Sequence, residues 1–263
     1  MSLLELHDVH KHFASHGSGL FKKDGAVVKA VNGVTLNVAK GEILGLVGES
    51  GCGKSTLSRM VMQLTPPTTG RIVLEGNELT SLSQKEVRSH RLDFQMIFQD
   101  PHASLNPRMT VFSTLSEAIR QRHPQRKGDE LTDSVLTLMK TVGLNPRFVR
   151  KYPHEFSGGQ RQRIAIARAL APEPKLIIAD EPVSALDVSI QSQILNLLLE
   201  LRERLGLTMI FISHDLSVVR YLADNIAVMR GGKIVDYGEA ENVFQNPSHE
   251  YTRTLISAIP LLA

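Results

Sequence analysis

The stretch EILGLVGESGCGKSTL, residues 42–57, decides the fold of this chain. Its first part, residues 42–48, is a short apolar run with the length and composition of a buried strand. From residue 54 onward the apolar positions follow helical spacing, and Pro66-Pro67 ends the predicted helix because proline supplies no backbone donor. The residues between strand and helix fit the pattern G-x-x-x-x-G-K-[ST], which in this context predicts a phosphate-binding loop.

Glycines in such a loop let backbone N–H groups curl around phosphate oxygens, and the start of the following helix adds a positive dipole end. We expect Lys54 to reach the β- and γ-phosphates of a nucleotide and the Ser55 hydroxyl to coordinate Mg²⁺. A glycine-rich turn that binds nothing is the alternative. The predicted loop residues are Gly48, Glu49, Ser50, Gly51, Cys52, Gly53, Lys54, Ser55 and Thr56.

Two acids follow a later strand. The apolar segment KLIIAD (175–180) places Asp180 and Glu181 at the carboxyl end of a predicted strand, which is the edge where parallel sheets bind ligands. We expect Asp180 to hold Mg²⁺ through water and Glu181 to polarise an attacking water. The alternative is a pair of acids that only caps the element after Pro182.

His214 and Gln99 also follow apolar strands. His214 comes after LTMIFIS (207–213), so we expect it at the same edge, in contact with the γ-phosphate. Gln99 comes after QMIF (95–98), and its amide is expected to touch the metal or the water. Taken alone, a glutamine after a strand carries little information. Together with Lys54 and Glu181, these two residues are the predicted catalytic groups.

The segment SGGQ, residues 157–160, predicts a helix start. Ser157 is a good N-cap, and the glycines Gly158 and Gly159 expose backbone N–H groups at the positive end of that helix. This is a second anion-binding helix end in one chain. A single chain cannot easily place both ends on one nucleotide, so we infer that Ser157 to Gln160 contact the nucleotide of a partner. An ordinary capped helix start explains SGGQ equally well.

The rest of the chain predicts an α/β fold. Strands are expected at 3–9 and 26–38, around a loop at 15–25, and a mostly helical region at 83–172 carries a buried stripe. Beyond residue 175 apolar strands alternate with helices, which indicates a mostly parallel sheet covered on both faces. A helical insertion near 100–160 interrupts this core. The stripe is Leu131, Val135, Leu138 and Met139.

Composition excludes several classes of protein. Apolar residues make up 42% and charged residues 22% of the 263 residues, which excludes disordered and fibrous chains. We find no apolar run of about 18 residues and no signal sequence, and one cysteine excludes an internal disulfide framework. A formal net charge of +3 is too small to indicate that the protein binds nucleic acid. The basic run at 120–127 is expected to be a solvated surface.

The N-terminal histidines and the single cysteine carry weaker hypotheses. Strand alternation places His7 on the opposite face from His10 and His12. We therefore do not expect these three residues and His16 to form a metal site. Cys52 lies at the start of the phosphate-binding helix, where a thiol can be activated. We expect its alkylation to block ATP sterically, and we expect no catalytic role for the thiol.

These motifs, in this order, resemble those of the nucleotide-binding subunits of ABC transporters over essentially the whole chain. The resemblance includes the phosphate loop, Gln99, FSGGQ at 156–160, Asp180-Glu181, SALD at 184–187 and His214. It implies an ABC ATPase fold: a P-loop core with a mostly parallel sheet, an N-terminal antiparallel β subdomain and an inserted helical subdomain. Phe13 matches the ring that stacks on adenine, with a core phenylalanine as the alternative, and Phe156 replaces a more frequent leucine as an apolar anchor.

The resemblance also implies how the chain is divided and what it joins. One domain is expected, with core parts at 1–98 and 161–240, a helical part at about 99–160 and a tail at 241–263. Finer motifs, such as FQDPHASLNPRMT (98–110) and NPSHEYTRTLISAIP (246–260), are similar to importers of oligopeptides, dipeptides or nickel.

In that family two subunits close head to tail on two ATP molecules. Glu181 then acts as the base, His214 holds the γ-phosphate, and Ser157–Gln160 and Asp187 act across the interface. Mg²⁺ is expected at Ser55, Gln99 and Asp180. The expected partners are a second copy or a paralogue, two permease subunits and, indirectly, a solute-binding protein, with no nucleic acid. The implied location is peripheral, on the cytoplasmic face of the inner membrane.

Two other functions stay open. A soluble ABC protein that acts on nucleic acid or the ribosome usually has two fused nucleotide domains or a long coiled-coil insertion, neither of which this sequence shows. A P-loop kinase would leave SGGQ idle and would tolerate replacement of Ser157. The cargo is not encoded in the motifs of an ATPase subunit.

Overall fold

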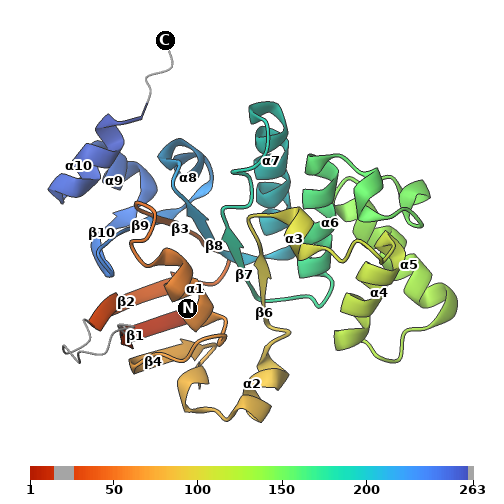
Figure 1. Cartoon of the computed structure of the whole chain (residues 1–263), viewed down its shortest axis with the longest axis horizontal. Helices are drawn as coiled ribbons and strands as arrows, with labels where there is room; N and C mark the ends of the chain where they lie inside the picture. The colour runs from red at the N-terminus through yellow and green to blue at the C-terminus, as the bar shows by residue number, and fades with distance from the viewer. Residues whose placement is uncertain (15–26, 260–263) are drawn as a thin grey trace, which may run out of the picture. The chain divides into compact units, whose positions relative to one another are not determined.

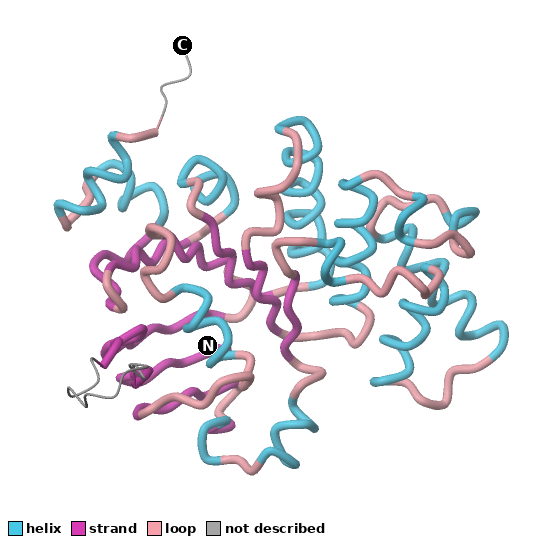
Figure 2. The backbone as a smooth tube through the Cα atoms, viewed as in Figure 1, coloured by secondary structure: helices cyan, strands magenta, loops and turns pink. Residues whose placement is uncertain are grey.

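The computed structural model describes residues 1–14 and 27–259, so the loop expected at 15–25 lies outside the described residues. The chain divides into two compact units, Met1–Val87 with Phe211–Ala263, and Arg88–Ile210. Figure 1 labels the elements of both units, and Figure 2 shows that strands gather in the first unit and helices in the second. Helix α2 (Gln84–His90) and strand β8 (Thr208–Ser213) each run across a boundary between the units.

An antiparallel sheet forms the N-terminal part of the first unit. Its strands are β1 (Ser2–Ala14), β2 (Val27–Ala39), β4 (Thr69–Leu74) and β5 (Asn77–Glu78), in the order β2-β1-β4-β5. Leu4 pairs with Val38 on one side and with Leu74 on the other, and it is fully buried. This sheet confirms the predicted antiparallel β subdomain.

Strand β1 is longer than the strand expected at 3–9. A bulge at Asp8, where φ is 47°, shifts the register between Leu6 and Val9, and the strand then continues to Ala14. The Asp8 N–H leaves the ladder and donates to Thr35 Oγ1 at 3.1 Å. A bulge of this kind depends on a partner across the sheet, which local sequence patterns do not reveal.

The phosphate-binding segment of the first unit rests on a buried strand. Strand β3 (Ile43–Val47) is buried along its whole length and pairs in parallel with β9 (Asn225–Arg230), which pairs antiparallel with β10 (Lys233–Glu239). Helix α8 (Leu216–Leu222) packs on β3 so closely that a Cβ on Gly45 would lie 2.2 Å from Val219 Cγ1. The remaining elements of this unit are α1 (Lys54–Val61), the 3-10 turn Leu79–Ser81, α9 (Ala240–Gln245) and α10 (Glu250–Ser257).

The second unit is mostly helical around two parallel strands. Strand β6 (Phe94–Ile97) pairs with β7 (Leu176–Asp180), and Phe94 lies opposite Leu176. The helices are α3 (Pro101–Ser104), α4 (Val111–Arg122), α5 (Gly128–Thr141), α6 (Gly158–Leu170) and α7 (Val188–Leu205), with 3-10 turns at Pro146–Phe148 and Pro153–Glu155. The parallel pairs β3–β9 and β6–β7, with helices between strands in the chain, confirm the predicted α/β class.

The predicted stripe on α5 is confirmed at three of its positions. Leu131, Val135 and Met139 are buried, whereas Leu138 is half-buried and lines an open cavity. The buried residues recur every fourth position, so they form one row along the helix, and Leu138 falls beside that row. Helix α7 ends at Leu205, and its C-cap Gly206 has a left-handed backbone with a φ of 63°.

Across residues 1–14 and 27–259, none of the helices combines the length and the apolar character that crossing a bilayer requires.

Candidate nucleotide-binding site

The predicted strand–loop–helix unit is present. Strand β3 ends at Val47, and α1 begins at Lys54 with Gly53 as its N-cap. The first hydrogen bond at the start of this helix runs from the Leu57 N–H to the Gly53 carbonyl, at 2.9 Å. The N–H groups that precede Leu57 in the helix therefore have no acceptor inside it and are available to an anion.

Two glycines let the loop lie directly against other backbone segments of the first unit. At Gly48, φ is 147° and a Cβ would lie 2.1 Å from the Met229 carbonyl oxygen. At Gly53, φ is 116° and a Cβ would lie 2.2 Å from the Ala30 carbonyl oxygen. No other residue fits these contacts, because an L-side chain would be both strained and in collision.

The turn between β9 and β10 also supports the loop. The Gly232 N–H donates to the Cys52 carbonyl at 2.9 Å, and the Gly232 carbonyl accepts from Asn32 on β2 at 2.8 Å. The loop is thus tied to β2 and to the β9–β10 turn, and its backbone N–H groups keep a defined direction.

Lys54 lies inside the loop. Its side chain is 5% exposed, and its Nζ donates to the carbonyls of Gly48 at 2.6 Å and Glu49 at 2.9 Å. An ammonium group placed among backbone N–H groups makes a site for several phosphate oxygens. The neighbouring Ser55 is exposed, so its hydroxyl is accessible to a metal ion.

A second set of predicted residues meets within the second unit. Gln99 follows β6 and Glu181 follows β7, and since these strands are parallel their carboxyl ends share one edge. Gln99 Nε2 donates to Glu181 Oε2 at 3.1 Å and to Ser184 Oγ at 3.3 Å. The amide oxygen of Gln99 is the atom of this side chain that can act as a metal ligand.

The backbone at Glu181 adopts an unusual conformation. Its φ is 47°, and Ser184 Oγ donates to its carbonyl at 3.1 Å. Left-handed backbone at a non-glycine residue costs energy and is frequent at active sites. A turn at 182–185 follows these acids, and the next helix, α7, begins only at Val188 with Asp187 as its N-cap.

The donor set fits a magnesium ion. Asp180 ends β7 and is half-buried, and within the second unit it adds a carboxylate to the Gln99 amide. Oxygen ligands of these kinds are those that Mg²⁺ takes in nucleotide sites. The exposed Ser55 hydroxyl is an oxygen donor of the same kind in the first unit.

SGGQ starts helix α6 as predicted. Ser157 Oγ accepts from the Gln160 N–H at 3.4 Å, and Gln160 Oε1 accepts from the Ser157 N–H at 3.1 Å, which together form a capping box. Within this chain the segment therefore acts as an ordinary capped helix start. Ser157 is exposed and Phe156 is 4% exposed against Phe148, so the apolar anchor expected at Phe156 is confirmed.

The remaining predicted residues lie on exposed surface. His214 directly follows β8 and is exposed, and the next residue, Asp215, caps α8 by accepting from the Ser217 N–H at 2.9 Å. Phe13 is 43% exposed at the end of β1, so the alternative of a core phenylalanine is wrong. Asp187 is exposed and its side chain makes no capping hydrogen bond.

The N-terminal histidines pair with neighbouring acids. His7 Nε2 lies 3.1 Å from Glu5, and His10 Nε2 lies 3.0 Å from Asp8. Among the described residues, no group of three or more histidine, cysteine or acidic side chains is arranged to hold a metal ion. His16 lies outside the described residues.

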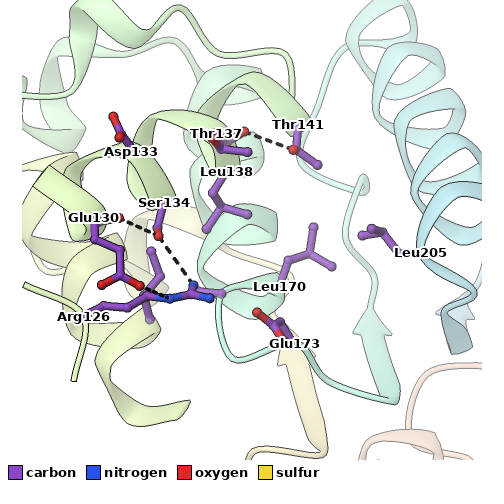
Figure 3. A pocket seen from close by; sticks show the side chains of 12 residues that line it. Arg126, Glu130, Asp133, Ser134, Thr137, Leu138, Thr141, Leu170, Glu173 and Leu205 are labelled. Carbon is purple, nitrogen blue, oxygen red and sulfur yellow. Dashed lines mark hydrogen bonds and ion pairs between the residues drawn. The ribbon is translucent and has the colours of Figure 1, made fainter. Parts of the chain in front are cut away.

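A cavity of about 490 Å³ in the second unit is separate from all the predicted site residues (Figure 3). It lies along α5, where the Arg126 side chain reaches Glu130 at 3.5 Å and Ser134 at 3.5 Å. Leu138, Leu170 and Leu205 supply apolar walls. The cavity holds none of the residues of the phosphate loop or of the Gln99–Glu181 pair.

Sequence reasoning missed two contacts of the predicted residues. Ser184 hydrogen-bonds Gln99, and Tyr251 on α10 accepts a hydrogen bond from the loop N–H of Glu49 at 3.0 Å. Ser184 lies in the SALD segment, so its neighbourhood was marked by a motif. Tyr251 lies 202 positions from Glu49, and no local pattern indicates such a contact.

The loop with its buried lysine, and the acid-bearing strand end, define a P-loop nucleotide hydrolase. The family model of the ABC transporter matches residues 31–184. The oligopeptide transport ATP-binding protein OppF of Escherichia coli (strain K12) is 51% identical over 260 residues, which cover 98% of this chain and 78% of the relative. The AppF protein of Bacillus subtilis (strain 168), which bears the same description, is 51% identical over 261 residues, 99% of this chain and 79% of the relative.

Solved structures agree with these relatives. The dimeric, post-hydrolysis structure of the ATP-binding cassette MJ0796, bound to ADP and phosphate, matches with a TM-score of 0.78 at 30% identity and covers 90% of this chain and 98% of that one. The chain belongs to the ABC transporter family, and it is an ATPase of that family. The predicted fold class and ATPase activity are confirmed, and the kinase alternative is excluded.

Proposed function

We propose that this protein is the ATP-hydrolysing subunit of an importer of short peptides. The observation that carries the proposal is the phosphate loop, with Lys54 Nζ held between two loop carbonyls at the start of α1. The OppF and AppF relatives, each described as an oligopeptide transport ATP-binding protein, support peptides as the cargo class. Nickel, the other cargo considered, has no support among these relatives.

In the proposed mechanism the first unit binds the triphosphate. Lys54 exchanges its two carbonyl acceptors for the β- and γ-phosphate oxygens, which are stronger, charged acceptors. The free N–H groups at the start of α1 hold the remaining oxygens, and Phe13 offers its exposed ring to adenine. His214, in the same unit, contacts the γ-phosphate while water attacks its phosphorus and ADP leaves.

The second unit supplies the groups that act on water. Glu181 accepts a proton from the attacking water, whose oxygen bonds to the γ-phosphorus while the bond to the β-phosphate oxygen breaks, giving ADP and phosphate. Gln99 orients the Glu181 carboxylate through the hydrogen bond at 3.1 Å. Ser55, Asp180 and Gln99 would hold a magnesium ion, which would supply neutralising charge to the phosphates.

We propose that the signature segment acts on the nucleotide of a second subunit, in a head-to-tail dimer. Ser157 and Asp187 are exposed, and the neighbouring Val188 is 80% exposed although it is apolar. An exposed valine beside exposed polar groups is suited to a surface that a partner covers. The dimeric structure of the related cassette MJ0796, bound to ADP and phosphate, supports a dimer of cassettes.

Closure of the dimer would drive two permease subunits, and the protein would sit peripherally on the cytoplasmic face of the inner membrane. The chain contacts the solute-binding protein only through the permease. A paralogous ATPase can take the place of the second copy. Descriptions of the relatives as transport proteins support this assembly over a soluble ABC protein that acts on nucleic acid or the ribosome.

The test replaces Glu181 with Gln and measures mass in solution by light scattering, with ATP and Mg²⁺ added. Glu203→Gln, on the exposed side of α7, is the matched control. A dimer that appears only with ATP in E181Q, and not in E203Q, supports the proposal. A persistent monomer with intact ATP binding overturns the homodimer and leads to co-expression with a paralogue, and absence of ATP binding overturns the whole proposal.

A further inference from the structure

The tail of the chain reaches the phosphate loop. Helix α10 (Glu250–Ser257) carries Tyr251, whose hydroxyl oxygen accepts a hydrogen bond from the Glu49 N–H at 3.0 Å. Glu49 is the second residue of the loop, directly after Gly48. This contact lies within the first unit, and it is a third support of the loop beside β2 and the β9–β10 turn.

The environment of Tyr251 holds its ring in place. The residue is 5% exposed, and the Arg230 guanidinium carbon lies 4.7 Å from the centre of its ring. Burial raises the pKa of the Tyr251 hydroxyl above its usual value. The hydroxyl therefore stays neutral near physiological pH and keeps the same hydrogen-bonding role across that range.

Strand β10 fixes the start of α10. Asp236 on β10 is 8% exposed and accepts from the Ser248 N–H at 2.9 Å, the Ser248 hydroxyl at 2.8 Å and the His249 N–H at 3.2 Å. His249 is the N-cap of α10, and its Nδ1 accepts from the Tyr251 N–H at 3.0 Å. A buried carboxylate with three donors leaves the helix start little freedom, so the position of Tyr251 is determined by β10.

We propose that Tyr251 is a positioning residue for the phosphate loop, through which the C-terminal helix sets the affinity for nucleotide. The inference rests on the proposed function, because it assigns the loop to ATP. A loop held in its binding shape before ATP arrives avoids the entropic cost of ordering on binding. Tyr251 touches neither the reacting phosphate nor the water, so it acts on affinity and leaves the chemical step unchanged.

The experiment replaces only the hydroxyl. In Tyr251→Phe the ring and its contact with Arg230 stay, and the Glu49 N–H loses its acceptor. Tyr237→Phe is the matched control, because the Tyr237 hydroxyl bonds a backbone carbonyl, that of Asn37 at 3.4 Å, in the same unit and away from the loop. ATP and ADP binding is measured by titration calorimetry, and KM and kcat by phosphate release.

We expect Y251F to raise the Kd for ATP and ADP, and the KM, by about tenfold, since the Glu49 N–H loses the acceptor that holds it in place, with kcat changed less than about twofold. Y237F should match the wild type. If the wild type binds ATP and Y251F binds it with the same affinity, the inference is overturned. A fall in kcat at unchanged KM also overturns it. If the wild type itself fails to bind ATP, the proposed function has failed instead.

A measurement on the wild type tests the contact separately, even if Y251F does not fold. Glu49 and Ser50 are both exposed, so in nucleotide-free protein the hydrogen bond to Tyr251 should make the Glu49 amide exchange its hydrogen at least about tenfold more slowly than the Ser50 amide. Asp236→Asn, which weakens the anchor of α10, should speed Glu49 exchange. Equal exchange at Glu49 and Ser50 in the wild type overturns the inference.

Discussion

Replacement of Gly48 by alanine tests the close packing of the phosphate loop, and Gly51→Ala is its control. Both glycines lie in the loop at positive φ, 147° and 80°. A Cβ on Gly51 would meet nothing within 4 Å, whereas a Cβ on Gly48 would lie 2.1 Å from the Met229 carbonyl oxygen and 2.9 Å from Cys52 Sγ. The two variants therefore share backbone strain and differ in the collision.

The expected magnitudes follow from that difference. Backbone strain lowers the free energy of unfolding of the Gly51 variant by about 1–2 kcal/mol. The Gly48 variant adds a collision with backbone, which cannot rotate away, and loses about 2–3 kcal/mol more. At about 2–4 °C per kcal/mol for a chain of this size, Gly51→Ala should melt about 4 °C below the wild type and Gly48→Ala about 12 °C below it.

The assay is thermal unfolding followed by far-ultraviolet circular dichroism, because the chain contains no tryptophan. ATP affinity is measured on the same samples. Melting temperatures for the two variants that agree within about 2 °C would refute the argument that the Met229 carbonyl limits the loop. If the Gly48 variant melts at the temperature of the Gly51 variant but no longer binds ATP, the loop has moved aside. This result would also refute a rigid contact with the Met229 carbonyl.

Three further predictions concern single contacts. Cys52 is 8% exposed with its Sγ 3.7 Å from Lys54 Nζ, so maleimide labelling should be slow, should abolish ATP binding and should be prevented by ATP; labelled protein that binds ATP normally would contradict this. Burial alone would raise the pKa of Asp236, but hydrogen bonds from Ser248 and His249 outweigh it and hold that pKa below its usual value. The stability that Asp236 contributes is thus present above about pH 4 and is lost as the pH falls through the lower folded-state pKa. The difference in urea midpoint between wild type and D236N should therefore disappear in acid. A difference that stays constant with pH would be evidence against this prediction. A Cβ on Gly159 would lie 2.4 Å from Ile190 Cγ2, whereas one on Gly158 would make an ordinary contact at 3.6 Å from Leu186. G159A should therefore lower the free energy of unfolding by about 1–3 kcal/mol and G158A by less than about 0.5 kcal/mol, as measured by urea titration. A larger loss in G158A than in G159A would contradict this prediction.

Much of the candidate site could be predicted from the sequence because its parts are local. The phosphate loop needs a strand, a glycine-rich turn and a helix start, all within residues 42–57. Gln99 and Glu181 each follow a strand, and parallel strands end at a common edge, so the 3.1 Å hydrogen bond between them agrees with their positions in the sequence. The helix start at Ser157 was predicted for the same local reason, and its capping box confirms it.

Other features depended on which distant segments the fold brings together. Phe13 lies outside the core because β1 continues beyond the bulge at Asp8, and Leu138 lies at a cavity because the row of Leu131, Val135 and Met139 faces inward. Burial of a residue depends on its neighbours in space, and periodicity gives only the face on which it lies.

The sequence by itself determined the nucleotide chemistry, since a phosphate-binding loop is a pattern of adjacent residues whose backbone does the binding. Only the tertiary structure decided what holds that loop in shape: the Met229 and Ala30 carbonyls against its glycines, and Tyr251 on its Glu49 N–H. These supports come from strands and a helix far away in the chain. Hydrogen bonds and close packing depend on distance in space, and a linear pattern carries no record of that distance.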